Sequence, residues 1–476
     1  MSEIWFMPAC EIARRVRKKE LSPVDVMQAA LARIEAVNPT LNALVAMRPD
    51  AALAEARAQA DRIARGEDPG PLAGLPLGVK DLEDAAGLPT TYGSLPFKDN
   101  QPARDSAQVT RLKAAGAIVL GKTNAPEFGY TALTKNLVYG VTRNPWNPAR
   151  TPGGSSGGSA AAIASGMLPL ATSSDGGGSI RIPACFVGAF GLKPNFGRVP
   201  TGPRKMLHWS DTAVYGPITR TVRDAALYMD AVVGAHPSDP DSLPHPGYSY
   251  ADMIEALPRR RRIAFNPSLG YATVQHDVMR EVEAAVQVFR DLGHHVVVTH
   301  DTLPDLGIEW ATVSGAEVYA EIADEIEMHR SQFGRGFLAG IERAKEISAA
   351  HMGRMYRLRA QLNQAIAELF ERFDLLLTPT LPIEAFSAAG PFPTEINGQP
   401  IATPLGAVAF TYPFNFSGHP AATVRAGMTD AGLPCGLQIV APRHREDLVL
   451  QAAYAYEQAR PWNHEWPLSV TQSSEA

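Results

Sequence analysis

Apolar residues recur along the chain in two patterns, a period of about 3.6 typical of amphipathic helices and short continuous runs typical of buried strands. Residues 9–37 and 51–65 show the helical period, and Ser22-Pro23 begins a second helix within the first segment. Serine caps helices, and proline suits the first helical position. The pattern predicts further helices over 106–115, 159–165, 274–292, 316–328, 335–373 (interrupted) and 447–458.

Short apolar runs predict strands between these helices, over 75–81, 117–120, 167–171, 262–265, 295–298, 375–378 and 437–440. Strands that alternate with helices favour an α/β fold, with helices on both faces of a largely parallel sheet. The 476 residues allow one large domain or two. N-terminal helices occupy 1–70, and residues 300–350 are the best candidate for an inserted, more variable helical cap.

Composition mainly argues against certain classes of partner, cross-link and cellular location. Hydrophobic residues make up 45% and charged residues 20% of the chain, with a net charge of -5, so neither nucleic acid nor a membrane is expected as a partner. Cys10, Cys185 and Cys435 lack CxxC spacing, which argues against a disulfide framework or a zinc knuckle. Residues 1–20 lack the apolar stretch of a secretory signal, and no apolar run reaches eighteen residues. We therefore expect a cytoplasmic protein.

Two glycine-serine clusters, over 153–159 and 175–181, are the most informative feature of the chain. Serine is a nucleophile only when a base removes its proton, and glycine is needed where the backbone turns tightly or approaches a ligand. Two such loops so close together predict one site in which hydroxyls and backbone N–H groups converge.

The first cluster also matches G-x-S-x-G, the nucleophile elbow of α/β-hydrolases, with Ser155 as the nucleophile. That elbow needs a strand directly before it, whereas residues 144–152 contain three prolines and no apolar run. His419 and His444 are the available late histidines, and neither has a distinguishing context. An esterase built on Ser155 therefore remains the weaker catalytic alternative.

Three other motifs favour structural interpretations. Residues 116–123 match the phosphate-loop pattern GxxxxGKT, but the four middle residues are themselves the predicted strand. No HExxH motif occurs, and adjacent His294 and His295 would point to opposite faces of a strand, so we expect no metal and no cofactor. Cys185 could form a set with Glu127 and Lys80, yet it lies in an apolar run, where cysteine is most often a small buried hydrophobe.

Lys80 is the remaining candidate base, because it ends an apolar strand. Burial of a charged lysine is costly, and desolvation lowers its pKa and leaves a neutral amine that can accept a proton. An ion pair with Asp81 would oppose this, but adjacent strand residues point to opposite faces.

Taken together, these residues resemble the amidase signature family. The resemblance covers most of the chain, is strongest over 72–203, and is highly specific because all of its elements occur in order. Those elements are Gly78–Asp81, Gly121–Asn124 with Glu127-Phe128, Asn144–Trp146, Thr151–Ala161, Asp175–Ala184, Gly191–Pro194 and Gly432–Gln438. The resemblance implies a single three-layer α/β/α domain over 1–476, built around a large mixed, mostly parallel twisted sheet.

The resemblance also implies a Ser–cis-Ser–Lys triad. By motif position Ser179 is the nucleophile, Ser155 is the bridging serine with a cis peptide bond, and Lys80 is the base; Ser156 as the bridge would place Ile180 at the nucleophile position. Backbone N–H groups of Gly176, Gly177, Gly178 and Ser179 are expected to form an oxyanion hole, with Ser156, Asp175 and Arg181 supporting the loop. Gly176 departs from the family, which usually has a larger residue there.

The substrate is expected to be a small apolar or aryl amide, with esters and carbamates open, cleaved with water by a monomer or homodimer. The residues assigned to its pocket are Gly154, Met206, Trp209, Tyr215 and Phe414, and for the stretch 410–416 packing in the core is an equal alternative. A glutamine-hydrolysing subunit of a tRNA-dependent amidotransferase would use the same triad, and a non-catalytic binding protein would not need it.

Overall fold

A single eleven-stranded sheet runs through the computed structural model, which describes residues 4–203, 211–258, 260–462 and 465–467. From one edge to the other the strands are β1 (Leu44–Met47), β3 (Ile118–Thr123), β2 (Pro76–Lys80), β6 (Leu170–Asp175), β8 (Val214–Thr219), β7 (Phe190–Lys193), β14 (Ala421–Met428), β15 (Pro434–Val440), β11 (Leu375–Pro379), β9 (Arg262–Phe265) and β10 (His295–Val298). Two short hairpins lie outside it, β4 (Lys135–Asn136) with β5 (Gly140–Val141) and β12 (Glu395–Ile396) with β13 (Gln399–Pro400).

The expected large mixed sheet is confirmed, but parallel pairs are fewer than the sequence pattern suggested. Parallel pairing joins β3 to β2, β2 to β6, β11 to β9 and β9 to β10, and the other six pairs are antiparallel. Five of those six involve β1, β7, β8 or β14, which the pattern did not predict. β7 and β8 are buried throughout and β14 over its first six residues, so no polar alternation marks these three strands.

Most predicted helices are present near their expected bounds. The long helices are α1 (Ala9–Arg17), α2 (Pro23–Leu41), α3 (Pro49–Ala64), α4 (Ala107–Ala114), α5 (Gly157–Ala164), α7 (Val222–Val232), α9 (His276–Asp291), α10 (Gly307–His329), α12 (Ala349–Arg372) and α14 (Glu446–Ala459), and the short ones are α6 (Arg181–Val187), α8 (Tyr250–Met253), α11 (Arg335–Ile341) and α13 (Tyr412–Phe416). Ser22 caps α2 as predicted, since its hydroxyl accepts the Val24 N–H at 3.1 Å. The strand expected over 167–171 begins at Leu170 instead, because a turn and irregular backbone over 165–169 separate the end of α5 from β6.

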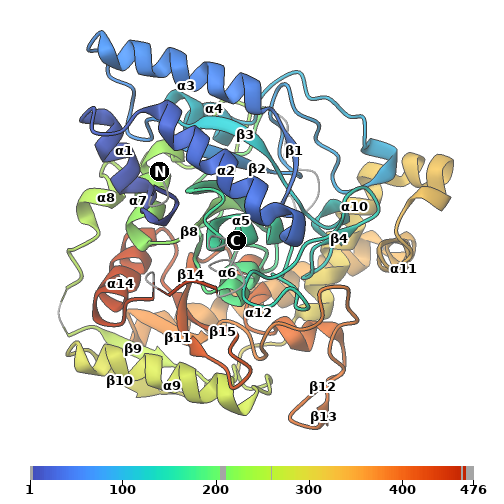
Figure 1. Ribbon diagram of the computed structural model, residues 1–476. Coiled ribbons are helices and arrows are strands. Elements are labelled where there is room, and N and C mark those ends of the chain that lie inside the picture. Colours follow the sequence, from blue (N-terminus) through green and yellow to red (C-terminus); the bar gives the residue numbers. More distant parts are fainter. Residues whose placement is uncertain (1–3, 204–210, 259, 463–464, 468–476) are drawn as a thin grey trace.

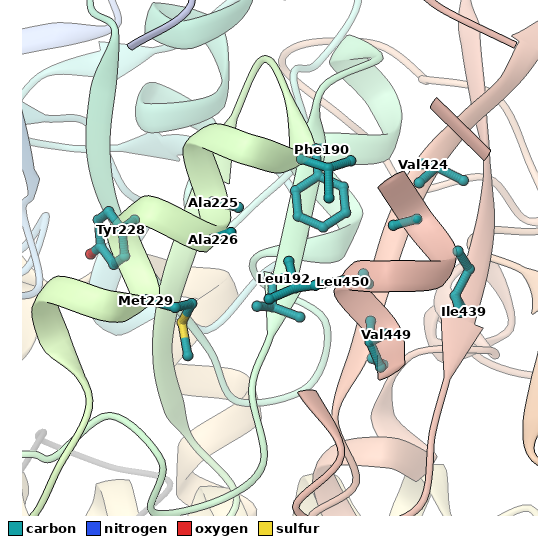
Figure 2. Packing of buried hydrophobic residues seen from close by; sticks show 14 of the residues in the cluster. Phe190, Leu192, Ala225, Ala226, Tyr228, Met229, Val424, Ile439, Val449 and Leu450 are labelled. Carbon is teal, nitrogen blue, oxygen red and sulfur yellow. The ribbon is translucent and has the colours of Figure 1, made fainter. Parts of the chain in front are cut away.

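Helices cover both faces of the sheet, as β7 illustrates. Phe190 and Leu192 point into a core shared with α7, α14 and β14, where Met229, Val449 and Val424 join them (Figure 2). Between them, the Cβ position of Gly191 faces Ala184 of α6 at 2.7 Å. Because successive strand residues point to opposite faces, α6 and α7 lie on opposite sides of the sheet.

The segment 300–350 is helical and stands beside the sheet, where α10 and α11 lie together at one side of the molecule (Figure 1). Phe333, Phe337 and Val318 from this segment pack against Tyr92, which follows β2, and Phe128, which follows β3. Among the residues that the structure describes, no helix is long and apolar enough to cross a membrane.

Register places the carboxyl ends of β2 and β6 side by side. The two strands run parallel, with Leu77 opposite Leu170 and Gly78 opposite Ala171. Lys80 ends β2 and Asp175 ends β6, so both reach the same edge of the sheet. Both glycine-serine loops adjoin this edge, because one precedes α5 and the other follows β6.

Candidate active site

Lys80 is buried at the end of β2, with only 1% of its surface exposed. Its Nζ donates to Ser155 Oγ at 2.7 Å and to Ser174 Oγ at 2.9 Å. Burial lowers the pKa of Lys80 from 10.5 to about 7, although Asp175 and Glu83 oppose the shift. A large share of this amine is therefore neutral near pH 7 and able to accept a proton.

Asp81 does not neutralise Lys80, as the strand geometry predicted. Its carboxylate accepts hydrogen bonds from the Thr91 N–H and hydroxyl, and it lies 3.8 Å from Lys122 Nζ. Lys122 also donates to the Glu83 carbonyl and to Thr90 Oγ1. The phosphate-loop interpretation of 116–123 is excluded, because Ile118–Thr123 form β3 and the lysine of the motif is fully buried.

The first glycine-serine loop presents Ser155 to Lys80. The Gly154–Ser155 peptide bond is cis. A Cβ on Gly154 would lie 2.6 Å from the Thr131 carbonyl oxygen, so this glycine packs against neighbouring backbone. Ser156 joins the two loops, since its N–H donates to the Ser179 carbonyl at 3.2 Å and its hydroxyl to the Ser174 carbonyl at 3.2 Å.

Neither late histidine approaches Ser155 as a base. His419 contacts Ser417 Oγ at 2.9 Å and stacks on Phe370, and burial together with Arg443 lowers its pKa to about 3. His444 donates its backbone N–H to Asn195 Oδ1. Residues 151–156 form no strand, so the context that a nucleophile elbow at Ser155 requires is missing.

An ion pair between Asp175 and Arg181 holds the second loop. Both side chains are fully buried; Arg181 Nε lies 3.0 Å from Asp175 Oδ2 and Arg181 Nη2 lies 3.0 Å from Oδ1. Burial alone would raise the pKa of Asp175, but the charge of Arg181 outweighs it and lowers the value to about 2. Arg181 also donates to Gln438 Oε1 at 2.7 Å, to the Thr411 carbonyl at 2.9 Å and to Asn415 Oδ1 at 2.5 Å.

The loop's N–H groups divide into two sets. Asp175 Oδ1 accepts the Gly178 N–H at 2.6 Å, which removes that group from the donors available to a substrate. Within the described chain, the N–H groups of Gly176, Gly177 and Ser179 have no acceptor, and Ser179 Oγ has no hydrogen-bond partner. Ser179 is partly exposed, whereas Ser155 is buried.

Several residues of the site escaped the sequence analysis. Trp310 Nε1 donates to the Gly176 carbonyl at 2.9 Å, and Thr411 Oγ1 donates to the Gly177 carbonyl at 2.7 Å. Neither has a local motif, because each reaches the loop from an element far along the chain. Ser174 directly precedes the second cluster, so its hydroxyl beside a buried lysine was a usable signal.

Cys185 does not form a set with Glu127 and Lys80. It lies in α6 against Gly436, and burial raises the pKa of its thiol well above the usual value. Glu127 accepts hydrogen bonds from Ser94 Oγ at 2.7 Å and from the Gly334 N–H at 2.8 Å. The three side chains therefore have separate partners.

Of the residues assigned to the substrate pocket, Met206 and Trp209 lie outside the described residues. Tyr215 on β8 is 5% exposed and Phe414 in α13 has no exposed surface, and both belong to the main hydrophobic core. For these two aromatic side chains, the alternative of core packing describes what is observed.

The backbone of residues 127–129 lies beside Ser155 and is supported by a second buried aromatic cluster. A Cβ on Gly129 would lie 3.2 Å from Ser155 Oγ and 2.8 Å from Leu82 Cδ1. The preceding residue, Phe128, stacks on Tyr92 and Phe337 with ring centroids 5.8 and 5.1 Å apart. The helical segment 300–350 therefore contributes Trp310 beside one glycine-serine loop and Phe337 beside the backbone that touches the other.

Comparison with known proteins agrees with this geometry. The family model described as Amidase matches residues 25–450. An acylamidase of Rhodococcus erythropolis is 35% identical over 469 residues, covering 97% of each chain. A glutamyl-tRNA(Gln) amidotransferase subunit of Thermosynechococcus vestitus is 34% identical over 482 residues, covering 96% of this chain and 98% of that protein.

Solved structures give the same result. A bacterial aryl acylamidase of the amidase signature family superposes with a TM-score of 0.91 at 33% identity, covering 99% of each chain. A 6-aminohexanoate cyclic dimer hydrolase, solved with its substrate, superposes with a TM-score of 0.88 at 31% identity, covering 98% of this chain and 99% of that one.

Proposed function

This chain belongs to the amidase family, the amidase signature enzymes, and we propose that it hydrolyses a small apolar or aryl amide through an acyl-enzyme on Ser179. The family and its relatives make it an amide-hydrolysing enzyme. The observation that supports this mechanism most directly is the buried contact of 2.7 Å between Lys80 Nζ and Ser155 Oγ, at a lysine whose pKa is about 7. Such a lysine is a base at neutral pH.

In the proposed acylation, neutral Lys80 takes the proton of Ser155, and Ser155 takes the proton of Ser179. The Ser179 hydroxyl turns toward Ser155 as substrate binds, and its oxygen attacks the amide carbonyl carbon. Charge that develops on the carbonyl oxygen is stabilised by the N–H groups of Gly176, Gly177 and Ser179, each typically worth about 3 kcal/mol. The carbon–nitrogen bond breaks, and the leaving nitrogen receives its proton through Ser155.

Deacylation uses the same groups in reverse. Water loses a proton to the Ser155–Lys80 relay and attacks the acyl carbonyl, which releases the carboxylate and restores Ser179. The buried Asp175–Arg181 pair holds the loop throughout, since each carboxylate oxygen already accepts backbone and guanidinium N–H groups. These two charged residues therefore support the loop and take no part in proton transfer.

The substrate preference rests on the relatives and not on the aromatic rings near Gly129. Phe128, Tyr92 and Phe337 are only 2%, 4% and 6% exposed, so they form a core of their own that supports the backbone beside Ser155. The similarity to an acylamidase and to an aryl acylamidase supports the preference. Aryl esters and carbamates could be cleaved by the same acyl transfer.

A glutamine-hydrolysing subunit is the second candidate, because the glutamyl-tRNA(Gln) amidotransferase relative is 34% identical over nearly the whole chain. Such a subunit would require partner subunits, whereas the proposed amidase would be active as purified. Ammonia release from glutamine, compared with amine release from an aryl anilide by the protein alone, separates the two functions.

The nucleophile is tested by trapping the acyl-enzyme in mass spectrometry with a panel of amides, esters and carbamates. Wild-type protein should carry the acyl mass on Ser179, Ser179→Ala should carry none, and Ser155→Ala should acylate slowly on Ser179. Ser165→Ala is the matched control, because the buried Ser165 hydroxyl donates only to carbonyls of α5. An adduct on Ser155 that persists in Ser179→Ala would favour the nucleophile-elbow alternative.

A further inference from the structure

We infer that Trp310, on α10 of the helical segment, is a positioning residue for the oxyanion hole. Its indole N–H holds the Gly176 carbonyl and thereby fixes the direction of the Gly177 N–H. The inference rests on the proposed acyl transfer, in which that N–H stabilises the developing charge.

The contact between α10 and the nucleophile loop is close and specific. Trp310 Nε1 lies 2.9 Å from the Gly176 carbonyl oxygen, across 134 residues of sequence. A Cβ on Gly177 would lie 2.1 Å from Trp310 Cζ2, so the indole ring packs directly on the backbone of Gly177. Glycine at 177 is therefore required for this approach, independently of any role in turning the chain.

Peptide geometry connects this contact to the oxyanion hole. The Gly176 carbonyl and the Gly177 N–H belong to the same planar trans peptide unit and point in opposite directions. A donor that holds the carbonyl on the side of Trp310 therefore turns the N–H to the other side. That N–H has no acceptor within the described chain, as a donor reserved for a substrate would require.

The neighbouring peptide unit is held in an equivalent way. Thr411 Oγ1 donates to the Gly177 carbonyl at 2.7 Å, and the N–H of that unit, on Gly178, bonds to Asp175 Oδ1. The second unit is thus fixed at both ends by protein, whereas the first is fixed only at its carbonyl. Three consecutive glycines are otherwise free to adopt many conformations, so the indole supplies a constraint that the loop's own side chains cannot.

Trp310 is itself held in place. Its ring stacks on Tyr412 with centroids 5.9 Å apart, and the Tyr412 hydroxyl donates to Asp305 Oδ1 at 2.6 Å. Tyr412 adjoins Thr411, so the two groups that hold the glycine carbonyls share one support at the start of α13. A segment outside the two serine loops would therefore help to set the catalytic rate.

The test compares Trp310→Phe with Trp146→Phe. Phenylalanine at 310 keeps an aromatic ring against Gly177 and loses the indole donor. Trp146 Nε1 donates to the Val187 carbonyl at 2.8 Å, so its substitution removes an equivalent bond elsewhere in the fold. Each protein is assayed for kcat and KM on an aryl anilide and for inhibition by an aryl trifluoromethyl ketone, whose carbonyl adds the serine oxygen and becomes an oxyanion.

Trp310→Phe should lower kcat roughly 10- to 100-fold, less than the roughly 100- to 1000-fold loss typical when an oxyanion donor is deleted outright. KM should stay within about twofold, and the ketone should bind more weakly by the same factor as kcat falls. Trp146→Phe should change none of the three. Benzothienylalanine at 310, which keeps the bicyclic shape without the N–H, should reproduce the loss if phenylalanine perturbs folding.

Unchanged kcat and ketone affinity in both 310 variants would overturn the inference, as would a rise in KM alone. The proposed function fails separately, if Ser179→Ala retains wild-type turnover and the ketone forms no adduct with wild-type protein. If the wild-type protein forms the ketone adduct and depends on Ser179, but Trp310→Phe changes neither kcat nor ketone affinity, only the positioning role is rejected.

Discussion

Lys80 should act as a base whose ionisation controls the rate in the physiological pH range. Its pKa of about 7, against 10.5 for an exposed lysine, corresponds to roughly 5 kcal/mol in favour of the neutral amine inside the protein. At pH 8 about nine-tenths of Lys80 is neutral, and at pH 6 only about one-tenth, so kcat/KM should fall about tenfold between them. An ordinary lysine would be less than about 1% neutral at either pH.

The assay is release of the aryl amine over pH 5 to 9 at low substrate concentration, so that kcat/KM reports the free enzyme. Lys80→Met should lose most of the rate. Lys193 needs a control of its own, because burial also lowers its pKa to about 7, while its Nζ donates to the Pro194 carbonyl and not to a serine of the site. Lys193→Met should therefore retain the midpoint near pH 7.

Two results would refute the reasoning about Lys80. A rate that is constant between pH 6 and 8 would mean that no group of this pKa has to lose a proton. A midpoint that disappears in Lys193→Met, with Lys80→Met still active, would assign the ionisation to the wrong lysine.

Three further predictions concern the surroundings of the relay. Gly177→Ala should nearly abolish turnover in protein that remains folded by circular dichroism, since its Cβ would overlap the Trp310 ring; activity near wild type would contradict the packing. Asp175 has a folded pKa of about 2 against 3.8, so its contribution of about 2 kcal/mol is present above pH 4 and is lost as the pH falls toward 2; urea unfolding of Asp175→Asn should lack this component of acid sensitivity. Cys185→Ala should keep kcat within a few-fold, because burial disfavours the thiolate, and loss of acylation in that variant would revive the cysteine alternative.

The sequence predicted the catalytic candidates better than their surroundings. The burial of Lys80 could be predicted because this lysine directly follows a run of apolar residues that form a buried strand. The structure confirms it, since Lys80 is 1% exposed. The direction of Asp81 followed from strand alternation alone. Such inferences succeed because they depend on neighbours one or two residues away.

Contacts made across the fold could not be predicted in this way. Trp310 meets Gly176 only after α10 has packed beside the sheet, and no local pattern distinguishes it from an ordinary core tryptophan. The sequence also assigned Gly178 to the oxyanion hole, but its N–H is already bonded to Asp175 and is not available to a substrate. For Tyr215 and Phe414, aromatic character suits a pocket and a core equally, and only their burial distinguishes the two.

The parallel register of β2 and β6 ties the alignment of the base to the packing of a glycine. A Cβ on Gly78 would lie 2.5 Å from Leu168 Cδ1 and 2.9 Å from Thr123 Cγ2, so a slip of one residue would force Leu77 or Val79 into space that accepts no side chain. The same slip would turn Lys80 away from Ser155, because side chains alternate along a strand. The alignment that lets this buried sheet pack is therefore also the one that delivers the base to its serine.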